Sequence, residues 1–286
     1  MHAGDQTSTE RNARNAIIAP VNTKNPSSRS KRLRHPWLFA LPGGKLPTSV
    51  TCRGERFDLV DTFKHDFFAA TGLYRSPHQL AVLKVNRVTD FFGVPMTWAG
   101  RFLARRETLF YRLAQDLPGV PRLIGNVGET GLLHVYVPGH TLGRREQVPD
   151  AFFDQLLTLA RELHKRHIAY VDLNKRQNIL VGDDRRPYLF DFQISAHLPP
   201  IGWRRLPPLR WLLARFQHGD SYHCLKHKRR LRPDLLTADE ERVLARLSFA
   251  IRLHRWIARP LTQLRRLVLR RLATEDSASV AGSSAK

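Results

Sequence analysis

Three polar side chains within residues 163–194 have types and a spacing that suit metal-assisted phosphate chemistry. Asp172 and Asp191 each follow an apolar or aromatic run, and the amide of Asn178 lies between them in the chain. Carboxylate and amide oxygens are hard ligands that Mg²⁺ accepts together with phosphate oxygens. Asn178 and Asp191 are therefore candidate metal ligands, and Asp172 is a candidate acceptor for the proton of an attacking hydroxyl.

A short hairpin is expected to position these side chains. Residues 179–181 should pair as a strand with residues 188–190, and the residues between them, which include two aspartates and a proline, mark the turn. Asn178 then precedes the first strand and Asp191 follows the second. The residues leave one alternative open, an ordinary helix and hairpin whose acids are simply solvated.

This segment resembles the catalytic segment of protein-kinase-like phosphotransferases, in which H-R-D-x-x-x-x-N is followed by D-F-G. The corresponding residues here are Tyr170-Val171-Asp172, Asn178-Ile179-Leu180 and Asp191-Phe192-Gln193. The asparagine comes sixth after the aspartate instead of fifth, which we interpret as one extra loop residue. Gln193 replaces a glycine that could adopt positive φ, so the flipping of regulated kinases is expected to be absent.

The resemblance implies a bilobal α+β fold with ATP and Mg²⁺ as cofactors. The kinase-like domain should span residues 51–273. Its small antiparallel β lobe, about 51–138, would have five strands near 57–61, 72–74, 80–85, 122–127 and 132–137, and its large lobe, about 139–273, would be mainly helical. Residues 149–167 have the apolar spacing of a helix beneath the catalytic loop.

Lys84 and Glu107 are the expected phosphate-holding pair. Lys84 is the one cation in the apolar run 80–85, and Glu107 is the one acid in the body of a helix expected over 99–116. In the family, such a lysine contacts the α- and β-phosphates and pairs with a helix glutamate. The alternatives are a lysine at a strand edge that points to water, and a glutamate that pairs only with neighbouring arginines.

The adenine and phosphate contacts leave less trace in the sequence. Tyr136 to Gly139 stands where a kinase hinge presents backbone groups to adenine. The segment 63–68, between the first two strands, contains no glycine, so phosphate contacts there must come from Lys64, His65 or backbone N–H groups. The motif LPGGK at 41–45 lacks features of a phosphate loop and is expected to be a turn.

The chain after Asp191 contains neither A-P-E nor D-x-W-x-x-G. This shifts the resemblance toward the bacterial lipopolysaccharide core (Kdo and heptose) kinases and the RIO-type kinases. The implied acceptor is a hydroxyl of a lipopolysaccharide-core sugar or a related glycolipid. Two alternatives remain open, a serine/threonine protein kinase and a non-catalytic nucleotide-binding scaffold on an anionic surface.

The net charge of +22 indicates an anionic neighbour, and it is unevenly placed. Residues 1–50 carry eight Lys or Arg against two acids, residues 202–272 carry eighteen against five, and residues 51–201 carry twenty against sixteen. Residues 1–50 and the tail 274–286 are expected to be disordered. The basic, tryptophan-rich part from 202 onward, including a final helix over about 238–273, suits a membrane headgroup surface or a solvated basic face.

Other partners and the location follow from what the sequence contains. Nucleic acid could use the same positive charge, but no base-reading motif is present. The two cysteines, Cys52 and Cys224, have no metal-binding spacing, the first twenty residues lack the apolar core of a signal peptide, and no run of eighteen apolar residues is present. We therefore expect a cytoplasmic protein that can lie on the inner face of the cell membrane.

Overall fold

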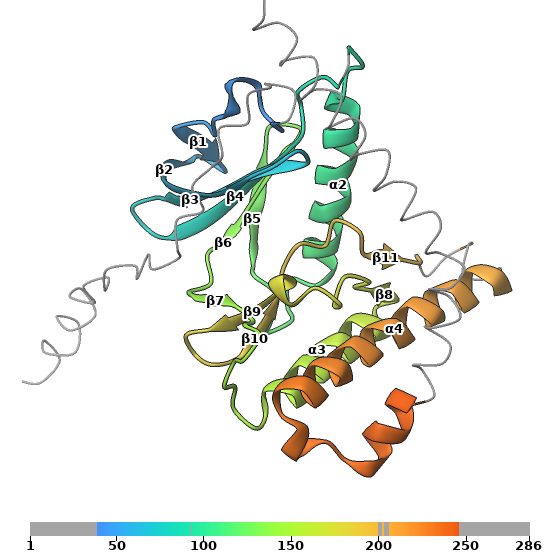
Figure 1. The fold of residues 1–286 in the computed structure, drawn as a ribbon. Helices are drawn as coiled ribbons and strands as arrows, with labels where there is room; N and C mark the ends of the chain where they lie inside the picture. Colours follow the sequence, from blue (N-terminus) through green and yellow to red (C-terminus); the bar gives the residue numbers. More distant parts are fainter. Residues whose placement is uncertain (1–38, 92, 200–201, 203–205, 246–286) are drawn as a thin grey trace, which may run out of the picture. The chain divides into compact units, whose positions relative to one another are not determined.

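The computed structural model describes residues 39–91, 93–199, 202 and 206–245, all of which belong to one compact unit, residues 37–286. Its first part is an antiparallel sheet with the strand order β1-β2-β3-β4-β6-β5 (Figure 1). The strands are β1 (Ser49–Cys52), β2 (Glu55–His65), β3 (Ala69–Arg75), β4 (Leu80–Asn86), β5 (Leu123–Val127) and β6 (Gly131–Val135). The five expected strands are all present, and β1 is a sixth that the sequence analysis missed.

The two edges of this sheet come together. The Cys52 thiol on β1 donates to the carbonyl of Asn126 on β5 at 3.6 Å. A Cβ at Gly125 would lie only 2.7 Å from the Cys52 sulfur, so glycine permits this approach. Burial explains why these residues form strands, because Phe57, Tyr74 and other large side chains of the sheet make a shared apolar cluster.

The segment before β1 is part of the fold. Ala40, Leu41 and Leu46 are buried and pack with Ala70 of β3. Pro42–Gly44 forms a 3-10 turn, as expected for the LPGGK motif. The prediction of disorder up to residue 50 is therefore wrong for residues 39–50, because their apolar side chains cover the start of the sheet. Residues 1–38 lie outside the described residues.

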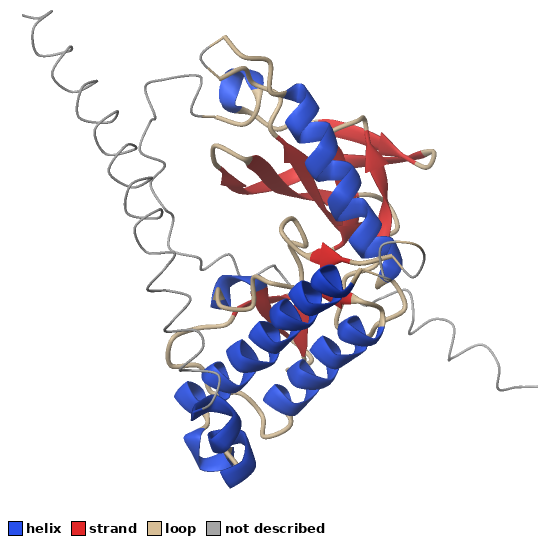
Figure 2. Cartoon of the chain, turned by 90° about the vertical axis from the view of Figure 1, so that its right-hand side faces the viewer, coloured by secondary structure: helices blue, strands red, loops and turns tan. Residues whose placement is uncertain are grey.

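Helix α2 (Thr97–Leu113) contacts β4, β5 and β6 and crosses the sheet (Figure 2). Its buried residues Gly100, Ala104, Glu107 and Tyr111 have the spacing of one helix face. A Cβ at Gly100 would lie 2.2 Å from the carbonyl oxygen of Arg87, so only glycine allows the helix this close to the end of β4. The predicted helix over 99–116 is confirmed, shifted by two to three residues.

The second part of the unit is dominated by helices. It contains α3 (Phe152–Lys165), η3 (Arg176–Asn178), α4 (Pro207–Leu231) and η5 (Pro233–Leu235), and the short strands β7 (Gly139–Thr141), β8 (Ile168–Ala169), β9 (Ile179–Gly182), β10 (Pro187–Leu189) and β11 (Ala196–His197). The α+β class is thus confirmed for the described residues. Residues 238–245 are helical, and the rest of the helix predicted to 273, with the tail 274–286, lies outside the described part.

The segment that contains the candidate residues Asp172, Asn178 and Asp191 packs on buried apolar side chains. The strands β9 and β10 pair antiparallel, with Ile179 opposite Leu189, so the predicted hairpin is confirmed. Helix α3 buries Phe152, Leu156 and Leu163 in the main core, and α4 packs along it. This arrangement supports the loop between β8 and β9 from below and fixes where its polar side chains emerge.

Candidate active site

Lys84, Glu107 and Asp191 lie together, although they come from three distant segments. The Lys84 Nζ donates to Glu107 Oε1 at 3.0 Å and to Asp191 Oδ1 at 2.7 Å. The Lys84 and Glu107 side chains are 12% and 1% exposed, whereas Asp191 is 38% exposed. The structure therefore contradicts the alternative of a strand-edge lysine that points to water.

The opposite charges in this group shift one another's pKa values. Burial alone would lower the pKa of Lys84, but the carboxylates of Glu107 and Asp191 outweigh it and raise the pKa above its ordinary value. Burial raises the pKa of Glu107 against the opposing effect of Lys84. For Asp191, burial would raise the pKa, but Lys84 lowers it below the usual range. A cation and an ionised carboxylate thus stand side by side at neutral pH.

The conformation around Asp191 is held by its neighbours. Asp191 itself has φ +64°, a left-handed conformation that aspartate tolerates better than most residues. Phe192 is fully buried and stacks on Phe110 of α2, and the Tyr170 hydroxyl donates to the Phe190 carbonyl. The Gln193 side chain donates to Asn86 Oδ1 at 2.9 Å. Gln193 is therefore a latch, a side chain that holds this segment to the end of β4, and the loss of flipping stays a prediction.

Asp172 and Asn178 also meet, despite the extra residue between them. The Asn178 side-chain nitrogen donates to Asp172 Oδ2 at 2.8 Å, and the Lys175 amine lies 2.6 Å from the same oxygen. The one-turn helix η3 takes up the added length. Because its nitrogen faces Asp172, the Asn178 amide oxygen has no hydrogen-bond partner among the described residues and can serve a cation.

Asp220 of α4 is a positioning residue that the sequence analysis missed. Its side chain is fully buried, and its two oxygens accept the backbone N–H groups of Tyr170 at 2.7 Å and Val171 at 2.8 Å. His164 Nε2 lies 3.2 Å from one of these oxygens. Val171 has φ +71°, which is strained for a β-branched residue. The two hydrogen bonds to Asp220 therefore stabilise a strained turn directly before Asp172. The available signal was that Asp220 is the one acid in α4.

The segment expected to contact adenine has free backbone groups. The Tyr136 N–H donates to Leu80 and the Pro138 carbonyl accepts from Asp183, whereas the Tyr136 carbonyl and the Val137 N–H have no partner in the described chain. Gly139 pairs with Gly182 of β9, and a Cβ on it would lie 2.3 Å from the Val181 carbonyl oxygen. Packing on β9 therefore explains this glycine, and its role beside a nucleotide stays a prediction.

The turn between β2 and β3 is not an open phosphate cradle. The Asp66 carboxylate accepts the N–H groups of Phe68 and Ala69 at 2.8 and 3.0 Å and pairs with Lys64 at 2.5 Å. His65 contacts the Leu41 N–H and the Gly44 carbonyl through its two ring nitrogens. The groups expected to reach phosphate from this turn are thus engaged within the protein.

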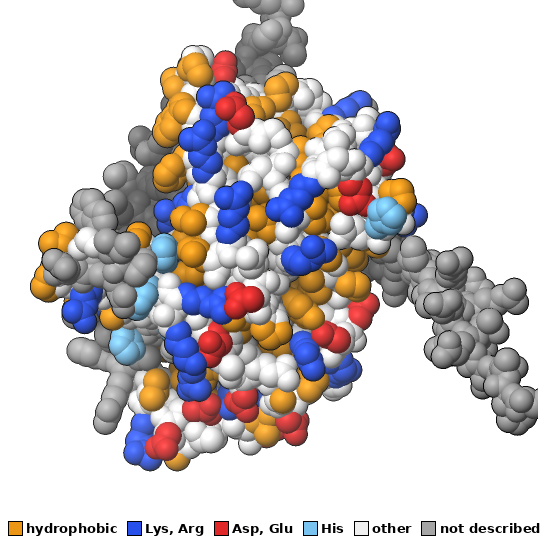
Figure 3. All heavy atoms as spheres, turned by 180° about the vertical axis from the view of Figure 1, so that it is seen from behind, with side chains coloured by type: hydrophobic (Ala, Val, Ile, Leu, Met, Phe, Trp, Pro, Cys, Tyr) orange, Lys and Arg blue, Asp and Glu red, His pale blue; other side chains and the backbone are white. Residues whose placement is uncertain are grey.

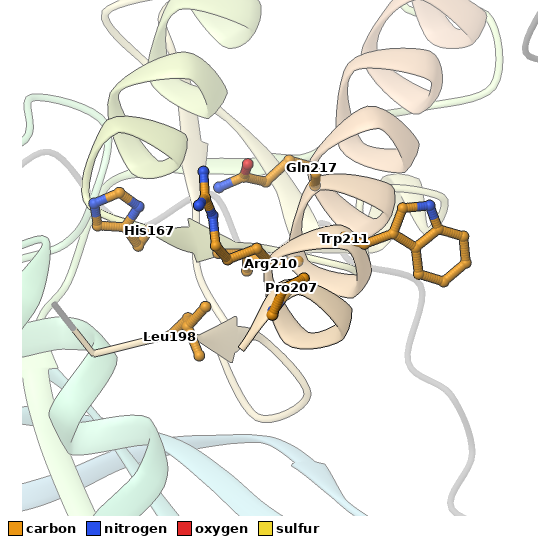
Figure 4. A pocket seen from close by; sticks show the side chains of 8 residues that line it. His167, Leu198, Pro207, Arg210, Trp211 and Gln217 are labelled. Carbon is orange, nitrogen blue, oxygen red and sulfur yellow. The ribbon is translucent and has the colours of Figure 1, made fainter. Parts of the chain in front are cut away.

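A separate pocket of about 450 Å³ lies at the start of α4 (Figure 4). Arg210 points toward His167 and Gln217, whereas the Trp211 ring is directed away from them. Gln217 donates to the carbonyls of His164 and Ile168. None of the lining residues belongs to the Lys84, Asp172 and Asp191 groups, so this pocket is distinct from the candidate active site.

Two other features are absent from the described residues. They contain no group of three or more His, Cys, Asp or Glu side chains that could hold a metal ion by itself. None of their helices is both long and apolar enough to cross a membrane. The first result is compatible with a Mg²⁺ site that uses one carboxylate, one amide and substrate phosphates.

Comparison with known proteins finds similarity in structure and none in sequence. No family model matches the chain, and no curated protein matches it. Two structures of the Rio2 kinase from Chaetomium thermophilum are similar. The ADP/Mg²⁺-phosphoaspartate complex has a TM-score of 0.47 at 15% identity over 65% of this chain and 61% of that one. The second structure has a TM-score of 0.46 at 13% identity over 65% and 63%. The chain thus matches about three fifths of each Rio2 chain.

Proposed function

We propose that this protein is a phosphotransferase of the protein-kinase-like fold that uses ATP and Mg²⁺ to phosphorylate a hydroxyl group. The observation that carries the proposal is the contact of Lys84 with both Glu107 and Asp191, the latter 107 residues away in the chain. Burying a lysine between two carboxylates costs desolvation free energy. A functional role, such as neutralising phosphate charge, would explain why such a group is present.

The donor set suits Mg²⁺. Asp191 offers a partly exposed carboxylate, and Asn178 offers an amide oxygen without a partner in the described chain. Mg²⁺ is commonly held by one or two such groups together with phosphate oxygens and water. When bound, the ion would neutralise charge on the phosphates and so ease transfer.

The remaining steps belong to the chain's own side chains. Lys84 would hold the phosphates, and the Tyr136 carbonyl and Val137 N–H would bind the adenine edge. Asp172 would orient the acceptor hydroxyl and accept its proton, with Asn178 fixing the carboxylate by its 2.8 Å hydrogen bond. Positioning and charge neutralisation, without a covalent intermediate, would supply most of the rate.

For the acceptor we propose a sugar hydroxyl of lipopolysaccharide core or a related glycolipid. Helix α4 supports this choice, because Trp211, Leu212 and Phe216 are 68%, 41% and 36% exposed and Arg215 lies among them. Exposed aromatic and aliphatic side chains beside arginine suit the headgroup region of an anionic membrane. The protein would then act at the cytoplasmic membrane surface. Trp203, expected in the same surface, lies outside the described residues.

Two observations favour a non-catalytic scaffold as the second candidate. Asp66 occupies the amides of the β2–β3 turn, and Lys175 pairs with Asp172 at 2.6 Å, so two groups that chemistry would use are engaged. The Lys175 side chain is 60% exposed, so an acceptor could displace its contact with Asp172 at little cost. A serine/threonine protein kinase shares the same core and differs only in its acceptor.

A transfer assay with labelled ATP separates these candidates. The wild-type protein would be incubated with Mg²⁺ and lipopolysaccharide, free core sugars or a protein extract. We expect label in the glycolipid, and loss of at least about 100-fold in rate for Asp172→Asn and Asp191→Ala. Asp183→Asn, a carboxylate change in the neighbouring turn, is the matched control and should retain activity. If label appears only in protein, the acceptor is a protein and the glycolipid proposal is wrong. Nucleotide binding without any transfer would favour the non-catalytic scaffold.

A further inference from the structure

Arg176, four residues after Asp172, occupies an unusual position for an arginine. It lies in η3 at the catalytic loop, and its side chain is partly buried. One guanidinium nitrogen donates to the carbonyl of Gly143 at 3.2 Å. No carboxylate within the described chain pairs with it. The other N–H groups of this fixed cation are therefore available to an anion from outside.

Two further arginines converge on the same place. Arg144 directly follows Gly143, the residue bound by Arg176. Helix α4 is tied to the catalytic loop by the contact of His227 Nε2 with the Leu173 carbonyl at 2.8 Å, and Arg230 follows His227 by three residues. Burial and then the charges of Arg230 and Arg144 lower the pKa of Arg176, as expected for three neighbouring guanidinium groups.

The acids of this region are paired with other side chains, and Glu146 also accepts the N–H of Gly143 at 3.2 Å. Described pairs are Asp172 with Lys175, Glu146 with His140, Asp150 and Asp234 with Arg232, and Asp154 and Glu240 with Lys228. Arg144, Arg176 and Arg230 have no such partner in the described part of the chain. A bound anion would relieve the repulsion among these like charges.

We propose that Arg144, Arg176 and Arg230 form a binding site for a phosphate group carried by the acceptor. An arginine cluster matches the geometry and charge of a phosphate ester. Because Arg176 lies on the same loop as Asp172, a phosphate bound there would orient a nearby hydroxyl toward that carboxylate. The acceptor's identity rests on the proposed phosphotransfer, whereas the anion site itself rests only on the arginines.

Calorimetric titration with inorganic phosphate tests the site directly. We expect the wild-type protein to bind phosphate, and Arg144→Ala/Arg230→Ala to bind it at least about tenfold more weakly. Arg105→Ala/Arg112→Ala, on the exposed side of α2, removes the same charge and should bind like the wild type. Lys84→Met should also retain binding, because the site lies apart from the nucleotide phosphates. Thermal unfolding would check that each variant is folded.

Three results would overturn the proposal. The first is that the wild type binds no phosphate up to about 10 mM. The second is that both arginine double variants lose phosphate affinity equally. The third is that only Lys84→Met loses phosphate affinity. The first would show that there is no anion site, the second a general charge effect, and the third binding at the nucleotide position.

A second experiment tests whether the arginines bind the acceptor, and its outcome is independent of the phosphate titration. In the transfer assay, Arg144→Ala/Arg230→Ala should raise KM about tenfold for intact lipopolysaccharide. Lipopolysaccharide whose phosphates have been removed should show the same KM with wild type and variant. Unchanged KM for the intact acceptor would contradict the role in acceptor binding. If no transfer occurs at all, the proposed function fails, and the phosphate titration still decides whether the arginine site exists.

Discussion

Replacement of Asp220 by asparagine should misplace Asp172 while leaving the nucleotide-binding side chains intact. Asp220 is 1% exposed and accepts two backbone N–H groups just before Asp172, at 2.7 and 2.8 Å. Asparagine keeps one oxygen and turns its NH₂ group toward the other donor. One buried N–H then loses its acceptor, and two donors face each other.

The size of the effect follows from these contacts. A hydrogen bond to a charged group contributes about 1.5–3 kcal/mol, and a buried donor without a partner costs a similar amount. We expect Asp220→Asn to lower the free energy of unfolding by about 2–3 kcal/mol, which corresponds to a fall in Tm of about 5–10 °C. Displacement of the catalytic carboxylate by about 1 Å should lower kcat about 100-fold.

Thermal unfolding measures the loss of stability, and the transfer assay measures the fall in kcat. Calorimetry measures whether the affinity for Mg·ATP is retained. The Kd for Mg·ATP should change less than about threefold, because Lys84 and Asp191 do not contact Asp220. The control is Asp154→Asn on α3, an exposed acid whose partner Lys228 keeps Glu240; it should cost less than about 1 kcal/mol. Wild-type kcat and Tm in Asp220→Asn would refute the reasoning.

Three other measurements test separate parts of the site. Lys84→Met should weaken Mg·ATP binding at least about tenfold in calorimetry, because the phosphates lose their cation; unchanged Kd would exclude that role. Gln193→Gly should lower kcat several-fold and speed hydrogen exchange at the end of β4, since the 2.9 Å bond to Asn86 is lost; identical exchange would show that no latch exists. Burial lowers the pKa of both His134 and His223 to about 4, so the unfolded chain takes up protons below about pH 6.5 while the folded protein does not. Stability should therefore be full above pH 6.5 and decrease toward pH 4, by about 2 kcal/mol for each histidine at pH 5; denaturant titrations with equal stability at pH 7 and 5 would contradict this.

Local pattern was enough to predict most elements. Alternation and turn residues indicated β2 to β6 and the β9–β10 hairpin, and apolar spacing indicated α2 and α3, with errors of a few residues at the ends. The segment 39–50 was assigned to disorder together with the rest of residues 1–50, whose composition is polar and basic. Its few apolar side chains become significant only where Ala70 and the sheet give them a surface to cover.

Five residues of the candidate site were predicted from the sequence, and Asp220 was missed. Residue type and order pointed to Lys84, Glu107, Asp172, Asn178 and Asp191, because a cation in an apolar strand and acids after apolar runs are unusual. Asp220 stood out only as the one acid in a basic helix, and such a residue has the appearance of a surface residue. Its partners are backbone N–H groups about 50 positions away, and backbone donors leave no trace in side-chain identity.

The sequence by itself determined the candidate side chains for phosphate and metal binding and the order in which strands and helices follow. Only the tertiary structure decided that Lys84 meets Asp191, that Asp66 occupies the amides of its own turn, and that Arg176 binds the carbonyl next to Arg144. The physical reason is that charge interactions depend on distance in space and on burial, and neither is encoded by separation along the chain.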